Sequence, residues 1–142
     1  MKYSKQGHCI YYAKYHIVLS TRYRRKIFNE GISGYLKWSL ESVERHYPEI
    51  KILETNTDVD HLHILVSIPP KVAVGEVVRL IKCNMGKALR KRYKFLKYVY
   101  YGRGGIWFRG YFVSTAGITE EALKRYIEYQ GREDRGQEQL EF

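Results

Sequence analysis

The segment HLHILVSI, residues 61–68, alternates polar and apolar side chains with the period of two that is typical of a β-strand. One side of this strand must face a hydrophobic core, and its members are Leu62, Ile64, Val66 and Ile68. His61 and His63 then project together from the opposite, open face of the sheet. Two adjacent imidazoles can converge on one metal ion, or they can be two partly exposed structural histidines.

The segments on either side predict the rest of a sheet and its helices. Residues 51–57 form a second β-type run, and the short connection Asp58–Asp60 makes an antiparallel pair with residues 61–68 the expected arrangement. Aromatic and β-branched residues predict two more strands, at residues 11–20 and about 107–114. Apolar residues at intervals of three and four predict three helices, from Asn29 to near Pro48, over residues 74–91, and from Thr119 onward.

The order of these elements is strand, helix, strand, strand, helix, strand and an extra C-terminal helix. It predicts an α+β fold with a ferredoxin-like or RRM-like βαββαβ antiparallel sheet, in which two helices cover one face and the other face is open. A chain of 142 residues without a repeat or linker is expected to form one domain. The charged and Gln-rich residues from about 132 to 142 are expected to form a flexible tail.

Composition favours a polyanionic partner. Lys and Arg number 25 against 15 acidic residues, for a formal net charge of +10. The chain has no apolar run long enough to span a membrane and no secretory signal, so we expect a cytoplasmic protein with no membrane partner. Cys9 and Cys83 lack the spacing of a zinc site or a redox pair and are expected to be reduced thiols.

Two basic segments are candidates for DNA binding. Residues 22–26 surround Tyr23 with cations, and the helix over residues 74–91 has a basic face. The candidate phosphate contacts are Arg22, Arg24, Arg25, Lys26, Lys82, Lys87, Arg90 and Lys91. The alternative for each segment is an ordinary solvated basic surface.

Three segments together resemble a known family. They are DHLHILV at residues 60–66, IWFRGYFVSTAG at residues 106–117 and TEEALKRYIEYQ at residues 119–130. In order and spacing they are similar to the motifs of the HUH endonucleases, and within these of the single-tyrosine transposases of insertion sequences that move as single-stranded DNA. The resemblance covers nearly the whole chain.

The resemblance implies a site built from two segments. The nucleophile would be Tyr126, and the metal ligands would be His61, His63 and Gln130, which bind Mg²⁺ or Mn²⁺. Tyr126 and Gln130 are four residues apart, and such residues share one face of a helix.

Two neighbours of these residues each have two interpretations. Tyr129 is the rival nucleophile, but no glutamine or histidine lies at the corresponding offset after it. Asp60 is expected either to orient a metal-bound imidazole by a hydrogen bond, without touching the metal itself, or simply to end the turn between the strands.

The activity implied by the resemblance is metal-dependent cleavage and rejoining of single-stranded DNA at transposon ends, through a 5′-phosphotyrosine intermediate. The implied partners are single-stranded and hairpin DNA and a second copy of the chain, with exchange of the last helix about a hinge at Gly117–Ile118. Two alternatives remain open. One is a domesticated nickase of repeated palindromes with the same chemistry, and the other is a noncatalytic RRM-like module that binds nucleic acid.

Overall fold

The computed structural model describes residues 3–100, 105–115, 117 and 119–141. Its main sheet contains β3 (Lys14–Ser20), β4 (Lys51–Thr57), β5 (His61–Ser67) and β6 (Phe112–Ser114) in the order β4-β5-β3-β6. All three pairings in this sheet are antiparallel. The interleaving of strands from the two halves of the chain is the arrangement expected for a split βαβ fold, and the α+β class with an antiparallel sheet is confirmed.

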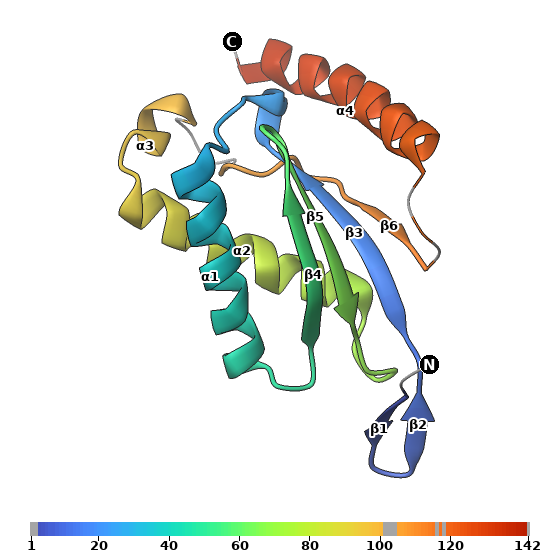
Figure 1. The fold of residues 1–142 in the computed structure, drawn as a ribbon. Helices are drawn as coiled ribbons and strands as arrows, with labels where there is room; N and C mark the ends of the chain where they lie inside the picture. The colour runs from blue at the N-terminus through green and yellow to red at the C-terminus, as the bar shows by residue number, and fades with distance from the viewer. Residues whose placement is uncertain (1–2, 101–104, 116, 118, 142) are drawn as a thin grey trace.

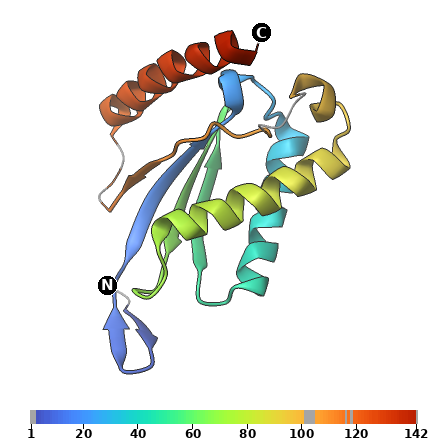
Figure 2. The same cartoon turned by 180° about the vertical axis from the view of Figure 1, so that it is seen from behind.

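Two long helices, α1 (Glu30–His46) and α2 (Val74–Arg92), cover one face of the sheet, and α2 crosses behind the strands in Figure 1 and in front of them in Figure 2. Asn29 begins α1, since its side chain accepts a hydrogen bond from the backbone N–H of Ile32. The apolar side of β5 packs into the core between sheet and helices, as its period of two predicts, with Leu62, Ile64, Val66 and Ile68 buried.

The N-terminal strand differs from the prediction. Residues 11–20 were expected to form one strand, but Tyr11 belongs to a separate hairpin of β1 (Ser4–Gln6) and β2 (Cys9–Tyr11), and β3 begins only at Lys14. Gly7 turns this hairpin with a positive φ of 57°. The hairpin extends away from the main sheet (Figure 1). Local β propensity is the same on both sides of the break, so only pairing with different partners divides the segment.

The last strand is also shorter than predicted. Residues 107–114 were expected to be one strand, but β6 covers only Phe112–Ser114, and Trp107 makes a single isolated bridge with Thr21. The carbonyl groups of residues 108–110 accept hydrogen bonds from the ammonium group of Lys82 on α2. A side chain far away in the sequence therefore takes these acceptors, and the edge strand is interrupted there.

The C-terminal helix α4 (Glu120–Glu141) lies apart from α1 and α2, at the end of the sheet where β3 runs into the short helix η1 (Arg22–Arg24) (Figure 1). Thr119 caps it by accepting the backbone N–H of Ala122. This helix runs on to Glu141, through most of the segment from about residue 132 to 142 for which a flexible tail was expected. Glu, Gln and Arg are good helix formers, so a helix that has already begun can propagate through such a segment.

No helix among the described residues is both long and apolar enough to cross a membrane.

Candidate functional site

The open face of the sheet carries the histidine pair. On β5, Leu62 and Ile64 are completely buried on the helix side, while His61 and His63 are half-buried on the other side. The antiparallel register sets His61 opposite Ser20 and His63 opposite Val18 on β3. The alternation of the strand thus brings both imidazoles onto the face that α1 and α2 leave uncovered.

Asp60 holds the ring of His61. Its Oδ1 lies 2.9 Å from Nδ1 of His61, which donates to it, and its Oδ2 lies 3.3 Å from the guanidinium of Arg24. The hydrogen bond from His61 and the charge of Arg24 lower the pKa of the Asp60 carboxyl, although its burial opposes them. Asp60 therefore stays ionised, and His61 keeps Nε2 available for a ligand.

Arg24 reaches Asp60 from a strained turn. Tyr23 and Arg24 both have positive φ, of 59° and 51°, in a region that side chains other than glycine seldom adopt. The turn is held by backbone hydrogen bonds, from Arg22 to the carbonyl of Ile106 and from Arg24 to the carbonyl of Thr21. Consecutive residues in this conformation persist only where their surroundings stabilise them, and such strain is common at functional sites.

His63 has a different partner, His16 on β3, which spacing along the sequence could not reveal. Nδ1 of His16 lies 3.1 Å from Nε2 of His63, at hydrogen-bonding distance. Burial lowers the pKa of His63, and the positive charge that His16 and His61 can carry lowers it further. His63 is therefore neutral at pH 7, which is the form of imidazole that binds metals.

The two remaining residues of the sequence-based site lie on the inner face of α4. Tyr126 is only 7% exposed, with its ring centroid 5.8 Å from that of Phe112, whereas Tyr129 is 49% exposed. Gln130 is completely buried, and its amide nitrogen donates to the carbonyl of Thr21 at 2.8 Å. The four-residue spacing thus turns Tyr126 and Gln130 toward the body of the protein and leaves the rival tyrosine facing outward.

The two histidines on the open face are too few to hold a divalent metal alone, and a further ligand must come from a residue other than His, Cys, Asp or Glu. Within the described ranges, no group of three or more His, Cys, Asp and Glu side chains is arranged to hold a metal ion. Two imidazoles leave open coordination positions, and a carbonyl oxygen from an amide side chain is an acceptable further ligand for a hard ion. Gln130, which the family resemblance implies as a metal ligand, is the candidate for this position.

The basic residues predicted to bind DNA do not form one uniform set. Lys87 and Lys91 on α2 and Lys26 beyond η1 are exposed. Arg24 is engaged with Asp60, Arg25 lies 5.4 Å from the ring centre of Tyr23, and the guanidinium of Arg22 lies 5.1 Å from the same ring.

Lys82 departs furthest from the expected role. Its ammonium group donates to the carbonyls of Phe108, Arg109 and Gly110 at 2.7, 3.2 and 3.0 Å. Burial lowers its pKa to about 8. In this conformation the charge of Lys82 ties α2 to the segment before β6 instead of facing solvent.

Beside Lys82 lies a cleft of about 370 Å³ between α2 and residues 105–109. Its cationic lining includes Lys87, Arg90 and Arg109, and Trp107 and Phe108 contribute aromatic surface. The cleft thus combines positive charge with aromatic rings, the combination that suits an unpaired nucleic-acid strand.

Comparison with known proteins identifies the family. The family model of IS200-like transposases matches residues 9–130. The chain is 34% identical, over 137 residues, to the transposase of insertion sequence element IS200 from Salmonella typhimurium, which covers 94% of this chain and 87% of that protein. It is 25% identical over 122 residues to the ISDra2 transposase TnpA from Deinococcus radiodurans, covering 85% and 86% of the two chains.

Two solved structures share the fold. A putative transposase from Deinococcus radiodurans superposes with a TM-score of 0.77 at 22% identity, covering 89% of this chain and 97% of that one. A REP-associated tyrosine transposase bound to a REP hairpin superposes with a TM-score of 0.54 at 17% identity, covering 85% and 68%. With a family model that spans most of the chain and a relative at 34% identity, the protein belongs to the IS200-like family of transposases, enzymes that cleave and transfer DNA strands.

Proposed function

We propose that this transposase cuts and rejoins single-stranded DNA at the ends of an insertion sequence, with Tyr126 as the nucleophile. The observation that carries the proposal is the orientation of the side chains on two parts of the molecule. The open sheet face offers a histidine pair with His61 oriented by Asp60, and α4 turns Tyr126 and Gln130 inward on one side. Membership of the IS200-like family supports the same assignment.

In the proposed reaction the phenolic hydroxyl of Tyr126 loses its proton to solvent, and its oxygen forms a bond to the phosphorus of a phosphodiester. The bond from phosphorus to the 3′ oxygen breaks, and that oxygen takes up a proton to become a free 3′-hydroxyl. The products are a 5′-phosphotyrosine and a 3′ end. Because the phosphotyrosine retains the energy of the original bond, a later attack by a 3′-hydroxyl can rejoin DNA without ATP.

A divalent metal, Mg²⁺ or Mn²⁺, would supply electrostatic stabilisation of the phosphate oxygens when bound. His61 and His63 would hold it, and Gln130 would complete the protein ligands. Asp60 would keep the His61 ring in the tautomer that leaves Nε2 free, as acceptors beside metal-bound histidines commonly do.

The burial of Tyr126 supports a further element of the proposal. A phosphate can reach its hydroxyl only if α4 shifts relative to the sheet or the ring swings out between Phe112 and Tyr129. We therefore propose a homodimer in which α4 of one copy can move to the histidine pair of the other copy. Of the expected hinge, Gly117 is exposed, and Ile118 lies outside the described residues.

The test is a covalent-adduct assay with labelled single-stranded DNA from the ends of the element, in Mn²⁺ or in EDTA, resolved on a denaturing gel. We expect a metal-dependent adduct that disappears in Tyr126→Phe and persists in Tyr129→Phe. Tyr129 is the matched control because it is a tyrosine on the same helix, three residues away. An adduct that survives Tyr126→Phe would refute the assignment of the nucleophile, and folded protein that forms none in Mn²⁺ would refute the proposed chemistry.

A further inference from the structure

We propose that an aromatic stack on the helix layer, formed by Tyr35, Trp38 and Arg92, is a second DNA-binding surface that holds unpaired bases. Tyr35 and Trp38 lie on α1 and Arg92 ends α2, so the stack is on the side of the sheet opposite the histidine pair. The proposal rests on the proposed function in one respect, that the substrate is DNA with unpaired segments.

The geometry of the stack resembles a platform for a base. The rings of Tyr35 and Trp38 lie nearly parallel, with centroids 5.6 Å apart and an angle of 28° between their planes. The guanidinium of Arg92 lies 5.0 Å from the centre of the Tyr35 ring. Trp38 is 55% exposed, although tryptophan side chains are on average mostly buried. Every base has a π-face, so a base can stack on the free face of an exposed indole whose other face already lies against a tyrosine ring.

The surroundings hold this platform in place before any ligand arrives. Tyr93 contacts Tyr35 edge to face, with centroids 5.9 Å apart, and its hydroxyl donates to the carbonyl of Gly31 at 3.2 Å. Side chains on a helix lean toward its N-terminus, so the Trp38 ring leans over the preceding turn, where Gly34 lies. Gly34 has no side chain, and a Cβ added to it would meet no atom within 4 Å, so this space is open. The stack is thus fixed from the α2 side, while the space over the preceding turn of α1 is open.

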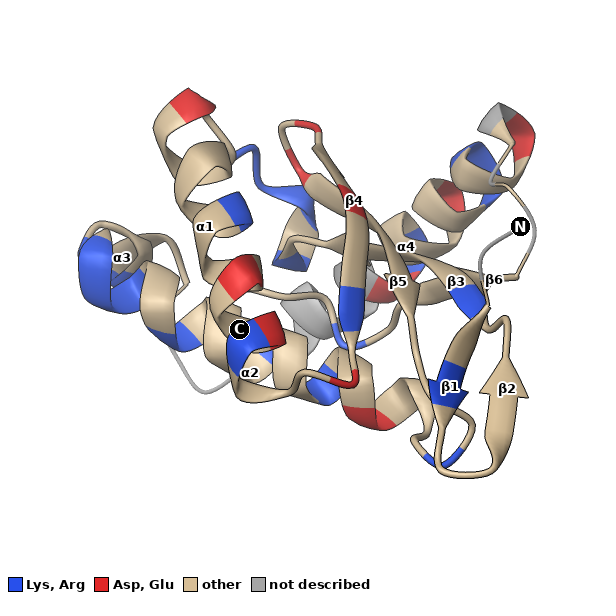
Figure 3. Cartoon of the chain, turned by 60° about the horizontal axis from the view of Figure 1, so that its bottom comes forward, with Lys and Arg blue, Asp and Glu red and all other residues tan. Residues whose placement is uncertain are grey.

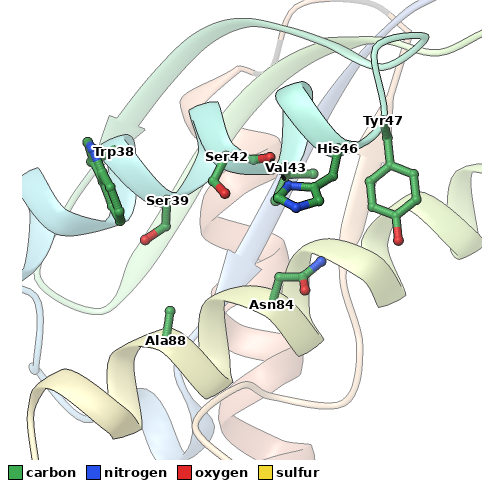
Figure 4. Close-up of a pocket in the computed structure, with 8 residues that line it drawn as sticks. All are labelled: Trp38, Ser39, Ser42, Val43, His46, Tyr47, Asn84 and Ala88. Carbon is green, nitrogen blue, oxygen red and sulfur yellow. Dashed lines mark hydrogen bonds between the residues drawn. The ribbon is translucent and has the colours of Figure 1, made fainter.

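A groove continues from the platform between the two helices. It has a volume of about 220 Å³, with Trp38 toward one end and Tyr47 toward the other, and His46 and Asn84 face each other across it (Figure 4). Ser39 lines it too, and among the described residues its buried hydroxyl has no hydrogen-bond partner. Polar groups of this kind can contact base edges or sugars next to a stacked base.

The charge around the platform selects a polyanion. No acidic residue occurs between Glu76 and Glu120, so α2 beyond its first turn and the short helix α3 (Leu96–Val99) are free of carboxylates. Lys91, Lys94 and Lys97 are exposed there, next to Arg92. Figure 3 shows Lys and Arg gathered on α3 and along α2. Stacking surface and cations in one place match single-stranded DNA better than an apolar protein partner.

The location separates this surface from the chemistry. Because the sheet and core lie between the stack and His63, a base on Trp38 cannot belong to the nucleotide being cleaved in the same protomer. The surface would therefore contribute affinity for a distant unpaired segment of the same DNA. Trp38→Ala should weaken binding without changing the reaction at saturating DNA.

The test uses the full chain and the fluorescence anisotropy of a labelled oligothymidine. Trp38→Ala is expected to weaken binding roughly ten-fold, the loss of about one stacked base, while Trp38→Phe keeps most of the affinity. The matched control is Tyr98→Ala, which removes an aromatic side chain on α3 that is 84% exposed but lies outside the stack. Intrinsic fluorescence is a second readout: Trp38 and Trp107 are the two tryptophans of the sequence, so quenching by DNA that is lost in Trp38→Phe comes from Trp38.

Three results would overturn the proposal: unchanged affinity in Trp38→Ala, an equal loss in Tyr98→Ala, or an equal loss on blunt duplex DNA, whose bases are already stacked. Thermal unfolding of each variant checks that it is folded. The covalent-adduct assay at saturating DNA distinguishes this proposal from the proposed function. If Trp38→Ala binds normally while the adduct still depends on Tyr126, only the second surface is refuted.

Discussion

The two faces of the sheet use the same strands for different purposes. Toward α1 and α2, β5 presents Leu62 and Ile64, which are completely buried and contribute to folding. Toward the open side the same strand presents His61 and His63, which are half-buried and bonded to Asp60 and His16. The difference shows that adjacent residues can serve stability and chemistry independently, because the pleat separates them by the thickness of the sheet.

Substitutions of neighbouring residues on β5 test most directly whether its two faces have separate roles. His63→Ala should reduce DNA cleavage below detection because it removes a proposed metal ligand, and it should change the free energy of unfolding little. The adduct assay and urea unfolding measure the two effects. His8→Ala, which removes an exposed histidine from the turn between β1 and β2, is the control and should remain active. Normal cleavage by His63→Ala would mean that the open face is not the catalytic face.

Ile64→Ala should show the opposite pattern. The side chain is completely buried, so we expect a loss of about 2–5 kcal/mol in the free energy of unfolding, while the folded fraction still cleaves DNA. Leu65→Ala removes a similar aliphatic group from the half-buried open side and should cost clearly less. Equal costs in the two variants would contradict the assignment of faces.

Asp60→Asn should sharpen the contrast by weakening the orientation of His61 alone. We expect metal affinity to fall by about 10- to 100-fold in calorimetric titration with Mn²⁺. Asp58→Asn is the control, because Asp58 accepts only from the backbone N–H of Val59 among its described hydrogen bonds. If both variants bind Mn²⁺ as the parent protein does, Asp60 is merely a turn residue.

Asp60 also has a pH signature. Its folded pKa is lowered below the ordinary value of 3.8, so the stability it contributes is fully present above that value and is lost as the pH falls through the folded pKa. The free energy of unfolding of the parent protein should therefore approach that of Asp60→Asn in strong acid. A difference that stays constant down to the lowest pH would contradict this linkage.

The smallest effect is expected for Lys82→Met. One of the three carbonyls it leaves is at the surface and the other two are only part-buried, so water can take the place of the ammonium group and the loss of stability should be modest. Burial lowers the pKa of Lys82 to about 8 from 10.5, so the unfolded chain binds more protons between these values. The parent protein should gain stability relative to Lys82→Met as pH rises from about 8 to 10.5, and a difference that does not change over this range would contradict the prediction.

Much of the fold could be predicted because its signals are local. The period of two in residues 61–68 separated core from open face, and the intervals of three and four in residues 74–91 marked α2 within one residue of its end. The two errors in strand length, at residues 11–20 and 107–114, occur where pairing partners decide. One segment divides between two sheets, and the other is interrupted by Lys82.

The candidate site was predictable where neighbours in sequence are neighbours in space. His61 and His63 share a strand face, Tyr126 and Gln130 share a helix face, and the resemblance of three segments to HUH transposases supplied their roles. The contact of His16 with His63 could not be found in this way. The two residues are 47 positions apart, and only the register of β3 against β5 brings them together.

The sequence by itself thus determined which side chains share a face, because that follows from the geometry of a single strand or helix. Tertiary structure alone decided what those faces meet. It set Arg24 against Asp60, tied Lys82 to the carbonyls before β6, buried Tyr126 beside Phe112, and assembled Tyr35, Trp38 and Arg92 from two helices. Such contacts depend on register and packing between distant segments, and these are properties of the whole fold that no local pattern encodes.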